Sequence, residues 1–404
     1  MTHSLLPAEG APPEAKILTY SGASNDFFRI LWRGSILSLV TFGIYRFWMM
    51  TELRRHLWMN TGIGQDRLEY TGRGIELFFG FLFAIAILAP FYVLYFVTSI
   101  EAARHAAFLG VPLVVVFFLF GQFAIYRARR YRLTRTTWRG IRFWMSGSGA
   151  RYMLLSVGWS LLVIGTVGLL LPWRETALER YKMSNTLYGD LRGSFVGRAR
   201  DFFKRGVWIW SLYFGSAALF VLASIFEKAA PQGGAGSLIG LDFFVMGVAS
   251  PFLYAAYRKT EMTWWIEGLR LGEVRFRADP DRISFVGLYW RMIGSLLLAI
   301  AVFALFVTAD AADYRQGVRA TSPAMFLHSA AGMVSITLAI LGYVAFILAI
   351  GMINRWFMQR GLWKIVANAT RVENLGAADH VKAMGQPSNA LGEGLASLLD
   401  VSGF

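Results

Sequence analysis

Apolar residues along this chain gather into eight long stretches, separated by shorter polar and basic segments. The stretches run over 27–50, 77–99, 106–125, 152–172, 207–226, 238–256, 284–308 and 324–353. Most approach the roughly 20 residues that a helix needs to cross the hydrocarbon core of a bilayer. Because backbone groups in lipid must hydrogen-bond within their own segment, these stretches are predicted to be helices. Small strands are predicted between them, at 17–20, 67–70, 142–145, 192–195 and 274–277.

Two parts of the chain repeat each other without a gap at an offset of 125 residues. The identical pairs include Gly43/Gly168, Trp48/Trp173, Arg55/Arg180, Asn60/Asn185, Thr61/Thr186 and Arg73/Arg198. Gly351, Trp356 and Asn368 reproduce the spacing of Gly43, Trp48 and Asn60, which suggests a degenerate third copy. The pattern predicts repeat units at 1–125 and 126–256, a degenerate unit at 257–375 and a flexible cytoplasmic tail at 376–404.

Composition supports a membrane protein, since 56% of the residues are apolar, 16% are charged and the mean hydropathy is +0.47. These values lie outside the range of soluble domains. The chain has no cysteine, which excludes disulfides and thiolate metal sites. Its net charge of +15 would favour nucleic acid in a soluble protein, but here the positions of the basic residues are better explained by membrane orientation.

The distribution of lysine and arginine distinguishes two topologies. If all eight stretches cross, the two sides collect 21 and 15 basic residues, whereas they collect 32 and 4 if 27–50 and 152–172 enter and leave on one face. The positive-inside rule favours the second arrangement, and Gly43 and Gly168 would provide its turns. The alternative stays open, because 152–172 contains no charge and hydropathy alone would make it a span.

The expected fold is therefore an all-α polytopic membrane protein. It would have six full transmembrane helices, two re-entrant or interfacial apolar segments and small strand-containing cytoplasmic caps. Both termini would lie in the cytoplasm.

Three motifs carry a resemblance to a known family. They are Thr41-Phe-Gly-Ile-Tyr-Arg-Phe-Trp48, Leu68-Glu-Tyr-Thr-Gly72-Arg-Gly74-Ile-Glu76-Leu77 and Arg135-Thr-Thr-Trp138-Arg139-Gly140-Ile-Arg142-Phe143. The chain resembles the YjgN-like family of bacterial inner-membrane proteins (domain of unknown function 898) over most of residues 20–375. It departs from the family at Arg46, where a proline is common, and at Ala369, where the third unit loses its threonine. The resemblance implies an inner-membrane location but supplies no activity.

Candidate chemistry is sparse. The chain has no phosphate-binding Gly-x4-Gly-Lys-Ser/Thr loop, no His-Glu-x2-His motif and no Gly-x-Ser-x-Gly elbow. Its five histidines fall in five separate segments. We therefore expect no catalytic residue, no metal, no cofactor and no enzymatic activity.

Two groups of residues are candidates for a ligand site. Asp242 and Arg291 are ionisable residues within apolar stretches, which often mark a polar pathway, although snorkelling toward the interface is the alternative. The repeated Asn-Thr pairs at 60–61 and 185–186, together with the repeated arginines, have donors that suit an anion. Helix capping and hairpin geometry are the favoured explanation of these pairs.

The functional hypothesis is passage or binding of a small solute or lipid through a repeat-built bundle. A non-catalytic envelope scaffold or lipid-organising protein is the alternative. The arginine-rich segment 126–143 favours contact with anionic headgroups at the cytoplasmic face over nucleic acid. The ligand and the oligomeric state stay open.

Overall fold

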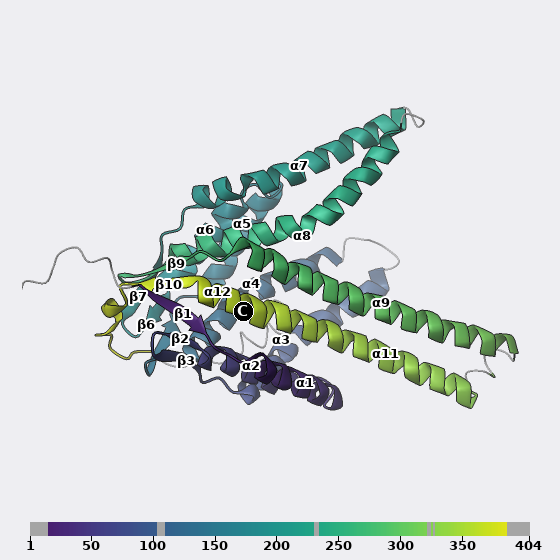
Figure 1. The fold of residues 1–404 in the computed structure, drawn as a ribbon, viewed down its shortest axis with the longest axis horizontal. Coiled ribbons are helices and arrows are strands. Elements are labelled where there is room, and N and C mark those ends of the chain that lie inside the picture. Colours follow the sequence, from purple (N-terminus) through teal and green to yellow (C-terminus); the bar gives the residue numbers. More distant parts are fainter. Residues whose placement is uncertain (1–14, 103–109, 230–233, 321–324, 326–327, 386–404) are drawn as a thin grey trace, which may run out of the picture.

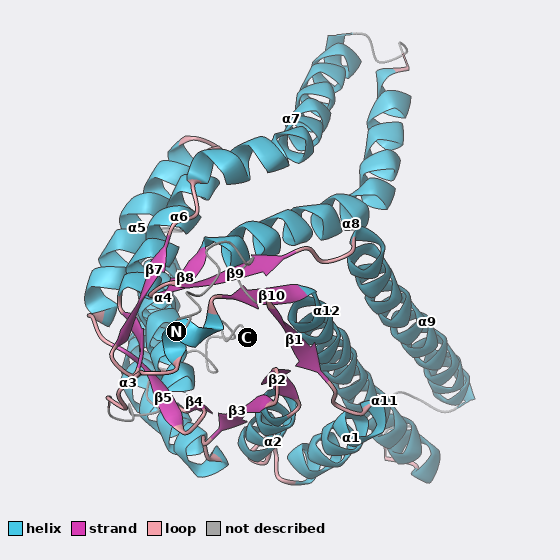
Figure 2. Ribbon diagram, turned by 60° about the vertical axis from the view of Figure 1, so that its left-hand side comes forward, coloured by secondary structure: helices cyan, strands magenta, loops and turns pink. Residues whose placement is uncertain are grey.

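The structure is a computed structural model that describes residues 15–102, 110–229, 234–320, 325 and 328–385. Within these ranges, pairs of helices project from one end of a small closed β-barrel (Figures 1 and 2). The helix pairs diverge with distance from the barrel, as the α7–α8 and α9–α11 pairs in Figure 1 show. The chain therefore returns repeatedly to the barrel between excursions along helices.

The barrel contains ten short antiparallel strands in the described residues. They are β1 (Lys16–Tyr20), β2 (Thr61–Ile63), β3 (Asp66–Tyr70), β4 (Thr136–Trp138), β5 (Ile141–Met145), β6 (Thr186–Tyr188), β7 (Leu191–Phe195), β8 (Leu269–Leu271), β9 (Val274–Ala278) and β10 (Thr370–Glu373). From β2 to β10 each strand pairs with the next, and β1 closes the barrel by pairing with both β2 and β10.

Four of the hairpins turn through only two residues, and each of those turns contains a glycine with a positive φ. The glycines are Gly64 (66°), Gly140 (73°), Gly189 (54°) and Gly272 (55°). Two-residue turns of this kind match the twist of antiparallel strands and need a left-handed residue, which glycine supplies at little cost. These turns fix the register between each three-residue strand and its longer partner.

Five equivalent backbone hydrogen bonds join neighbouring hairpins. In each, the residue that follows one strand donates its amide to the residue that precedes the next strand around the barrel. The bonds are Ser21 to Asn60 (2.9 Å), Thr71 to Arg135 (2.8 Å), Ser146 to Asn185 (2.8 Å), Val196 to Gly268 (2.9 Å) and Asp279 to Ala369 (3.3 Å). The barrel thus has the same junction at five places around its rim.

The helices form a ring on this rim. Their bounds are α1 (Ser24–Val40), α2 (Arg46–Met59), α3 (Gly74–Ala102), α4 (Gly110–Thr134), α5 (Gly149–Gly165), α6 (Leu171–Ser184), α7 (Ala199–Ala229), α8 (Ala235–Gly268), α9 (Arg282–Ala320), α11 (Ala330–Asn354) and α12 (Leu362–Ala369). Successive helices contact each other from α1 to α9, α9 contacts α11, and α11 contacts α1. Figure 2 shows this arrangement nearly along the barrel axis.

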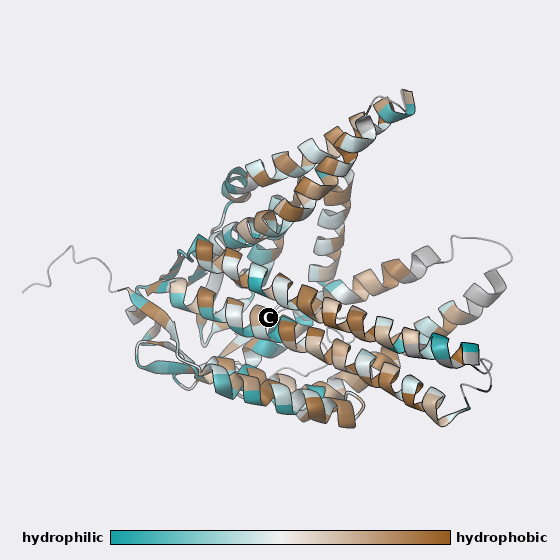
Figure 3. Cartoon of the chain, turned by 45° about the vertical axis from the view of Figure 1, so that its right-hand side comes forward, coloured by the Kyte–Doolittle hydropathy of each residue, from teal (hydrophilic) through white to brown (hydrophobic). Residues whose placement is uncertain are grey.

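The predicted all-α fold with six full spans and two non-crossing segments is wrong. The ten-strand barrel overturns the all-α class, and among the described residues five helices are long and apolar enough to cross a membrane. These are Gly74–Phe96, Ala199–Ala229, Gly236–Gly268, Arg282–Gln316 and Ala330–Ala369. The predicted segment 106–125 begins outside the described residues, and α4 is not among the five. Figure 3 shows the apolar residues of the α9–α11 pair extending away from the barrel.

The two segments predicted not to cross are not single elements. Each contains one helix, a tight turn and the start of a second helix that runs back to the barrel. The turn glycines Gly43 and Gly168 have φ values of +87° and +90°. In each turn the preceding residue is also left-handed, namely Phe42 (50°) and Val167 (51°). The fold thus places a helical hairpin, α1–α2 or α5–α6, in each segment, with its turn at Gly43 or Gly168, where the sequence predicted a turn.

Element bounds recur at the offset seen in the sequence. Helix α1 begins at Ser24 and α5 at Gly149, while β2 begins at Thr61 and β6 at Thr186, each 125 residues later. The third set of spaced residues behaves differently. Gly351 lies inside α11, and the chain continues through a π-helical segment, Arg355–Gly361, into α12 without a turn.

The barrel interior is an apolar core that the C-terminal segment covers. Trp138, Tyr188, Val274 and Val372 are buried together with Leu375 and Ala378 of a 3-10 turn, Leu375–Ala378. Polar contacts tie this segment to the hairpin turns: Arg139 with Asp379 (2.6 Å), and the Lys382 amide with Asp190 (3.0 Å). The expectation of a loose tail from 376 therefore does not hold for residues 376–385, and 386–404 lie outside the described residues.

Candidate functional site

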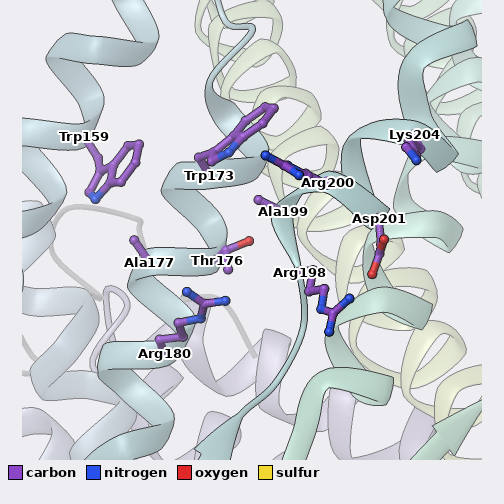
Figure 4. Close-up of a pocket in the computed structure, with 10 residues that line it drawn as sticks. All are labelled: Trp159, Trp173, Thr176, Ala177, Arg180, Arg198, Ala199, Arg200, Asp201 and Lys204. Atoms are coloured by element: carbon purple, nitrogen blue, oxygen red, sulfur yellow. The ribbon is translucent and has the colours of Figure 1, made fainter.

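A basic cavity of about 640 Å³ lies where α5 and α6 meet the beginning of α7 (Figure 4). Its lining residues come from these three helices and the link that leads into α7. They are Trp159, Trp173, Thr176, Ala177, Arg180, Arg198, Ala199, Arg200, Asp201 and Lys204. The volume falls within the ~300–1,000 Å³ typical of small-molecule sites.

Helix α6 supplies one face of the cavity. Trp173, Thr176, Ala177 and Arg180 are spaced three and four residues apart, so they lie on the same side of the helix. The Thr176 hydroxyl donates to the Pro172 carbonyl of the preceding turn (2.7 Å), which leaves its methyl group available for packing. This spacing gives the face an indole at one end and a guanidinium at the other.

The Arg180 guanidinium also contacts the segment that leads into α7. It donates to the Gly197 carbonyl (3.4 Å), directly before Arg198. The Arg198 carbonyl in turn accepts the amide of Asp201 in the first turn of α7 (3.2 Å). These contacts hold the two guanidinium-bearing residues at the junction between β7 and α7.

The charge of the cavity is strongly unbalanced. Four cationic side chains line it, Arg180, Arg198, Arg200 and Lys204, against the single carboxylate of Asp201. Figure 4 shows Arg180 and Arg198 away from Trp159 and Trp173, while Arg200 lies beside Trp173. The cavity therefore combines aromatic surface with cationic groups, which suits an anion attached to an apolar group.

At the corresponding positions, the first copy of the repeat has the identical residues but lacks two of the four cations. Trp48, Thr51, Arg55 and Arg73 occupy the positions of Trp173, Thr176, Arg180 and Arg198. Trp159 and two of the four cations that line the basic cavity are replaced there, because Gly34, Ile75 and Phe79 stand at the positions of Trp159, Arg200 and Lys204. Trp48 packs directly against Gly74, where an added Cβ would approach it to 2.8 Å.

Arg55 instead lines a different cavity of about 470 Å³, which also contains His56 and Asn60 and the carboxylates of Glu52 and Glu69. Its guanidinium donates to the Gly72 carbonyl (3.4 Å), as Arg180 does to Gly197. The carbonyl of Arg73 accepts the amide of Glu76 (3.1 Å). The duplicated arginines thus keep their backbone contacts, while the cavities beside them differ in charge.

The repeated Asn-Thr pairs make hydrogen bonds within the fold. Asn60 and Asn185 donate their side-chain amides to carbonyls four residues earlier, those of His56 and Tyr181 (2.7 Å each). The hydroxyls of Thr61 and Thr186 bond the carbonyls of Leu57 (2.8 Å) and Lys182 (2.9 Å). These bonds add side-chain donors to carbonyls in the last turns of α2 and α6.

Asp242 and Arg291 are not brought together. Asp242 lies near the start of α8, far from the barrel, and accepts a hydrogen bond from Ser216 of α7 (2.8 Å). Arg291 lies in the barrel-proximal part of α9, donates to the Gly287 carbonyl (3.0 Å) and lines a separate cavity. At 1.5 Å per residue the two positions differ by roughly 25 Å along the helices.

The arginine-rich segment 126–143 contains several arginines with partners inside the protein. Arg129 pairs with Glu179 (3.2 Å), Arg135 with Glu76 (2.9 Å), and Arg139 with Asp66 and Asp379 (2.6 Å each). Burial alone would raise the pKa of Glu179, but the neighbouring Lys182 and Arg129 outweigh it and lower the pKa to about 2. These arginines therefore connect helices and strands.

The fold defines the class of the protein, a membrane protein in which apolar helices extend from a closed ten-strand barrel. The chain belongs to the family described as bacterial proteins of unknown function, DUF898, whose pattern matches residues 16–398. This confirms the resemblance inferred from the sequence motifs. The inner membrane protein YjgN of Escherichia coli O157:H7 is 24% identical over 124 residues. That match covers 31% of this chain and 29% of YjgN, and no solved structure matches.

Proposed function

We propose that this protein resides in the bacterial inner membrane and binds the anionic headgroup of a phospholipid in the basic cavity. The observation that carries the proposal is the cavity's four cations against one carboxylate, together with the two indoles that line it. Guanidinium groups form strong, directional hydrogen bonds with phosphate oxygens. Tryptophan favours the boundary between headgroups and acyl chains.

The position of the cavity within the fold supports a headgroup as ligand. Arg180 lies one turn from the end of α6, and Arg198 directly precedes α7, so both lie close to the barrel. We infer that the barrel faces the cytoplasm, because the basic segments 126–151 and 257–283 both contain barrel strands. The cytoplasmic leaflet of a membrane carries anionic lipids, so Arg180 and Arg198 would lie at their headgroups.

Binding is favoured over passage of a solute. The two residues expected to form a polar pathway lie in different parts of the fold, and the barrel interior is filled by an apolar core. A lipid-organising role agrees with the alternative hypothesis from the sequence.

The test compares the two copies of the repeat. The full-length protein is purified in detergent, and bound phosphatidylglycerol and phosphatidylcholine are counted by native mass spectrometry. A basic residue near anionic lipid contributes about 1 kcal/mol, so the double variant R180Q/R198Q should bind phosphatidylglycerol roughly 30-fold more weakly.

The matched control is R55Q/R73Q, which removes the arginines at the equivalent positions of the first copy and should leave that affinity within about twofold of wild type. Equal losses in both double variants, or no loss in R180Q/R198Q, would contradict the proposal.

A further inference from the structure

A second cavity, of about 500 Å³, lies inside the ring of helices and shares no residue with the basic cavity. Its lining comes mainly from α2, α4, α6, α8 and α12, the helices that lead into strands β2, β4, β6, β8 and β10. The lining residues are Trp58, Ile125, Arg129, Arg132, Leu133, Thr136, Lys182, Met262, Trp265, Leu362, Trp363 and Val366. We call it the central cavity.

Two of its tryptophans are held rigidly by threonines at the starts of strands. The Trp58 indole donates to the Thr136 hydroxyl (3.0 Å), and the Trp363 indole donates to the Thr61 hydroxyl (2.8 Å). The two rings stack with their centroids 4.6 Å apart. Because both N–H groups already have acceptors, what these rings offer a ligand is apolar surface.

The polar side of the central cavity is cationic. Arg129 and Lys182 both pair with Glu179, which also accepts a hydrogen bond from Trp265, the third indole of the lining. Arg132 adds a third cation. Around the central cavity, three cations therefore stand against the single carboxylate of Glu179.

We propose that the central cavity binds one anionic amphiphile. Its charged group contacts Arg132 and the Arg129–Lys182 pair, and the first part of its alkyl chain lies along Trp58, Trp265 and Trp363. A phosphate and a carboxylate share this chemistry, so an anionic phospholipid from the bilayer and a free long-chain carboxylate are the two sources to distinguish. The inference is independent of the proposed headgroup site, since none of its residues line the basic cavity.

The experiment removes charge and space separately in the full-length protein. Arg132→Gln removes one cation, and Ile125→Trp fills part of the cavity. Val366→Phe is a second filling variant from another helix, for use if Ile125→Trp does not yield folded protein. Arg130→Gln is the matched control, because Arg130 lies on the same helix outside the lining. Native mass spectrometry measures one-to-one adducts with phosphatidylglycerol and, separately, with dodecanoate.

The expected result is an adduct that weakens roughly fivefold or more in Arg132→Gln, disappears in a folded filling variant and is unchanged in Arg130→Gln. Loss of the phosphatidylglycerol adduct alone identifies the bilayer as the source, and loss of the dodecanoate adduct alone identifies a free carboxylate. Adducts that persist with both ligands in the charge and filling variants would overturn the proposal. The adduct should also survive in R180Q/R198Q, which separates this site from the headgroup site.

Discussion

Replacing Thr61 by valine should destabilise the protein far more than the same change at Thr186, although both follow an asparagine in the repeated motif. Thr61 is fully buried, and its hydroxyl makes two hydrogen bonds, to the Leu57 carbonyl (2.8 Å) and from the Trp363 indole (2.8 Å). Thr186 is 3% exposed, and its hydroxyl bonds the Lys182 carbonyl (2.9 Å). The difference is the indole, which comes from a helix 302 residues away.

The magnitude follows from the groups left without partners. Valine has nearly the shape of threonine, so neither change leaves a large cavity. Losing one helix-end hydrogen bond costs about 1 kcal/mol, and leaving a buried donor unsatisfied adds about 1–3 kcal/mol. The free energy of unfolding should therefore fall by about 2–4 kcal/mol in Thr61→Val and by about 1 kcal/mol in Thr186→Val.

The assay is equilibrium unfolding in mixed micelles by titration with sodium dodecyl sulfate, with the apparent melting temperature as a second measurement. The sequence motif alone predicts equal effects, because Asn60-Thr61 and Asn185-Thr186 are identical. Equal losses at the two sites, or a smaller loss at Thr61, would refute the assigned role of the Trp363 contact.

Two further predictions concern the barrel and the Glu179 ion pairs. Because Ile17 pairs with Arg371 across the closing strands, the double variant I17C/R371C should form a disulfide in this cysteine-free chain. The control I17C/R277C joins positions two strands apart and should form none. Gel mobility with and without reductant distinguishes the two results. The pKa of Glu179 is lowered to about 2 from its ordinary 4.5. Its carboxylate therefore stabilises the fold by about 3 kcal/mol above pH ~4.5, and this stabilisation is lost as the pH falls toward 2. Glu179→Gln should remove this pH dependence and lower stability at pH 7; an unchanged profile in this variant would show that the dependence arises elsewhere.

The longer barrel strands could be predicted from the sequence, but their short partners could not. Segments such as 67–70 and 192–195 were expected as strands and lie within β3 and β7. The partners β2, β4, β6 and β8 have only three residues each, too few for an alternating pattern to be visible. Closure of the barrel depends on pairing between Ile17 and Arg371, and local patterns carry no information about contacts over such a separation.

The sequence revealed only those residues of the candidate site that are repeated 125 positions apart. Trp173, Arg180 and Arg198 were found because identical residues occur 125 positions earlier. Arg200 and Lys204, which make the cavity strongly basic, correspond to Ile75 and Phe79, so a search for repeated residues misses them. The central cavity was missed for another reason, because its tryptophans come from three different helices that only the ring brings together.

The most direct test of the central claim, that the basic cavity holds an anionic lipid headgroup, is an electron cryomicroscopy map of the protein in phosphatidylglycerol nanodiscs. The account predicts headgroup density between the guanidinium groups of Arg180 and Arg198, with acyl density beside Trp159 and Trp173. That density should be lost in R180Q/R198Q and kept in R55Q/R73Q. A well-resolved cavity without lipid density in the wild-type protein, or density unchanged in R180Q/R198Q, would contradict the account.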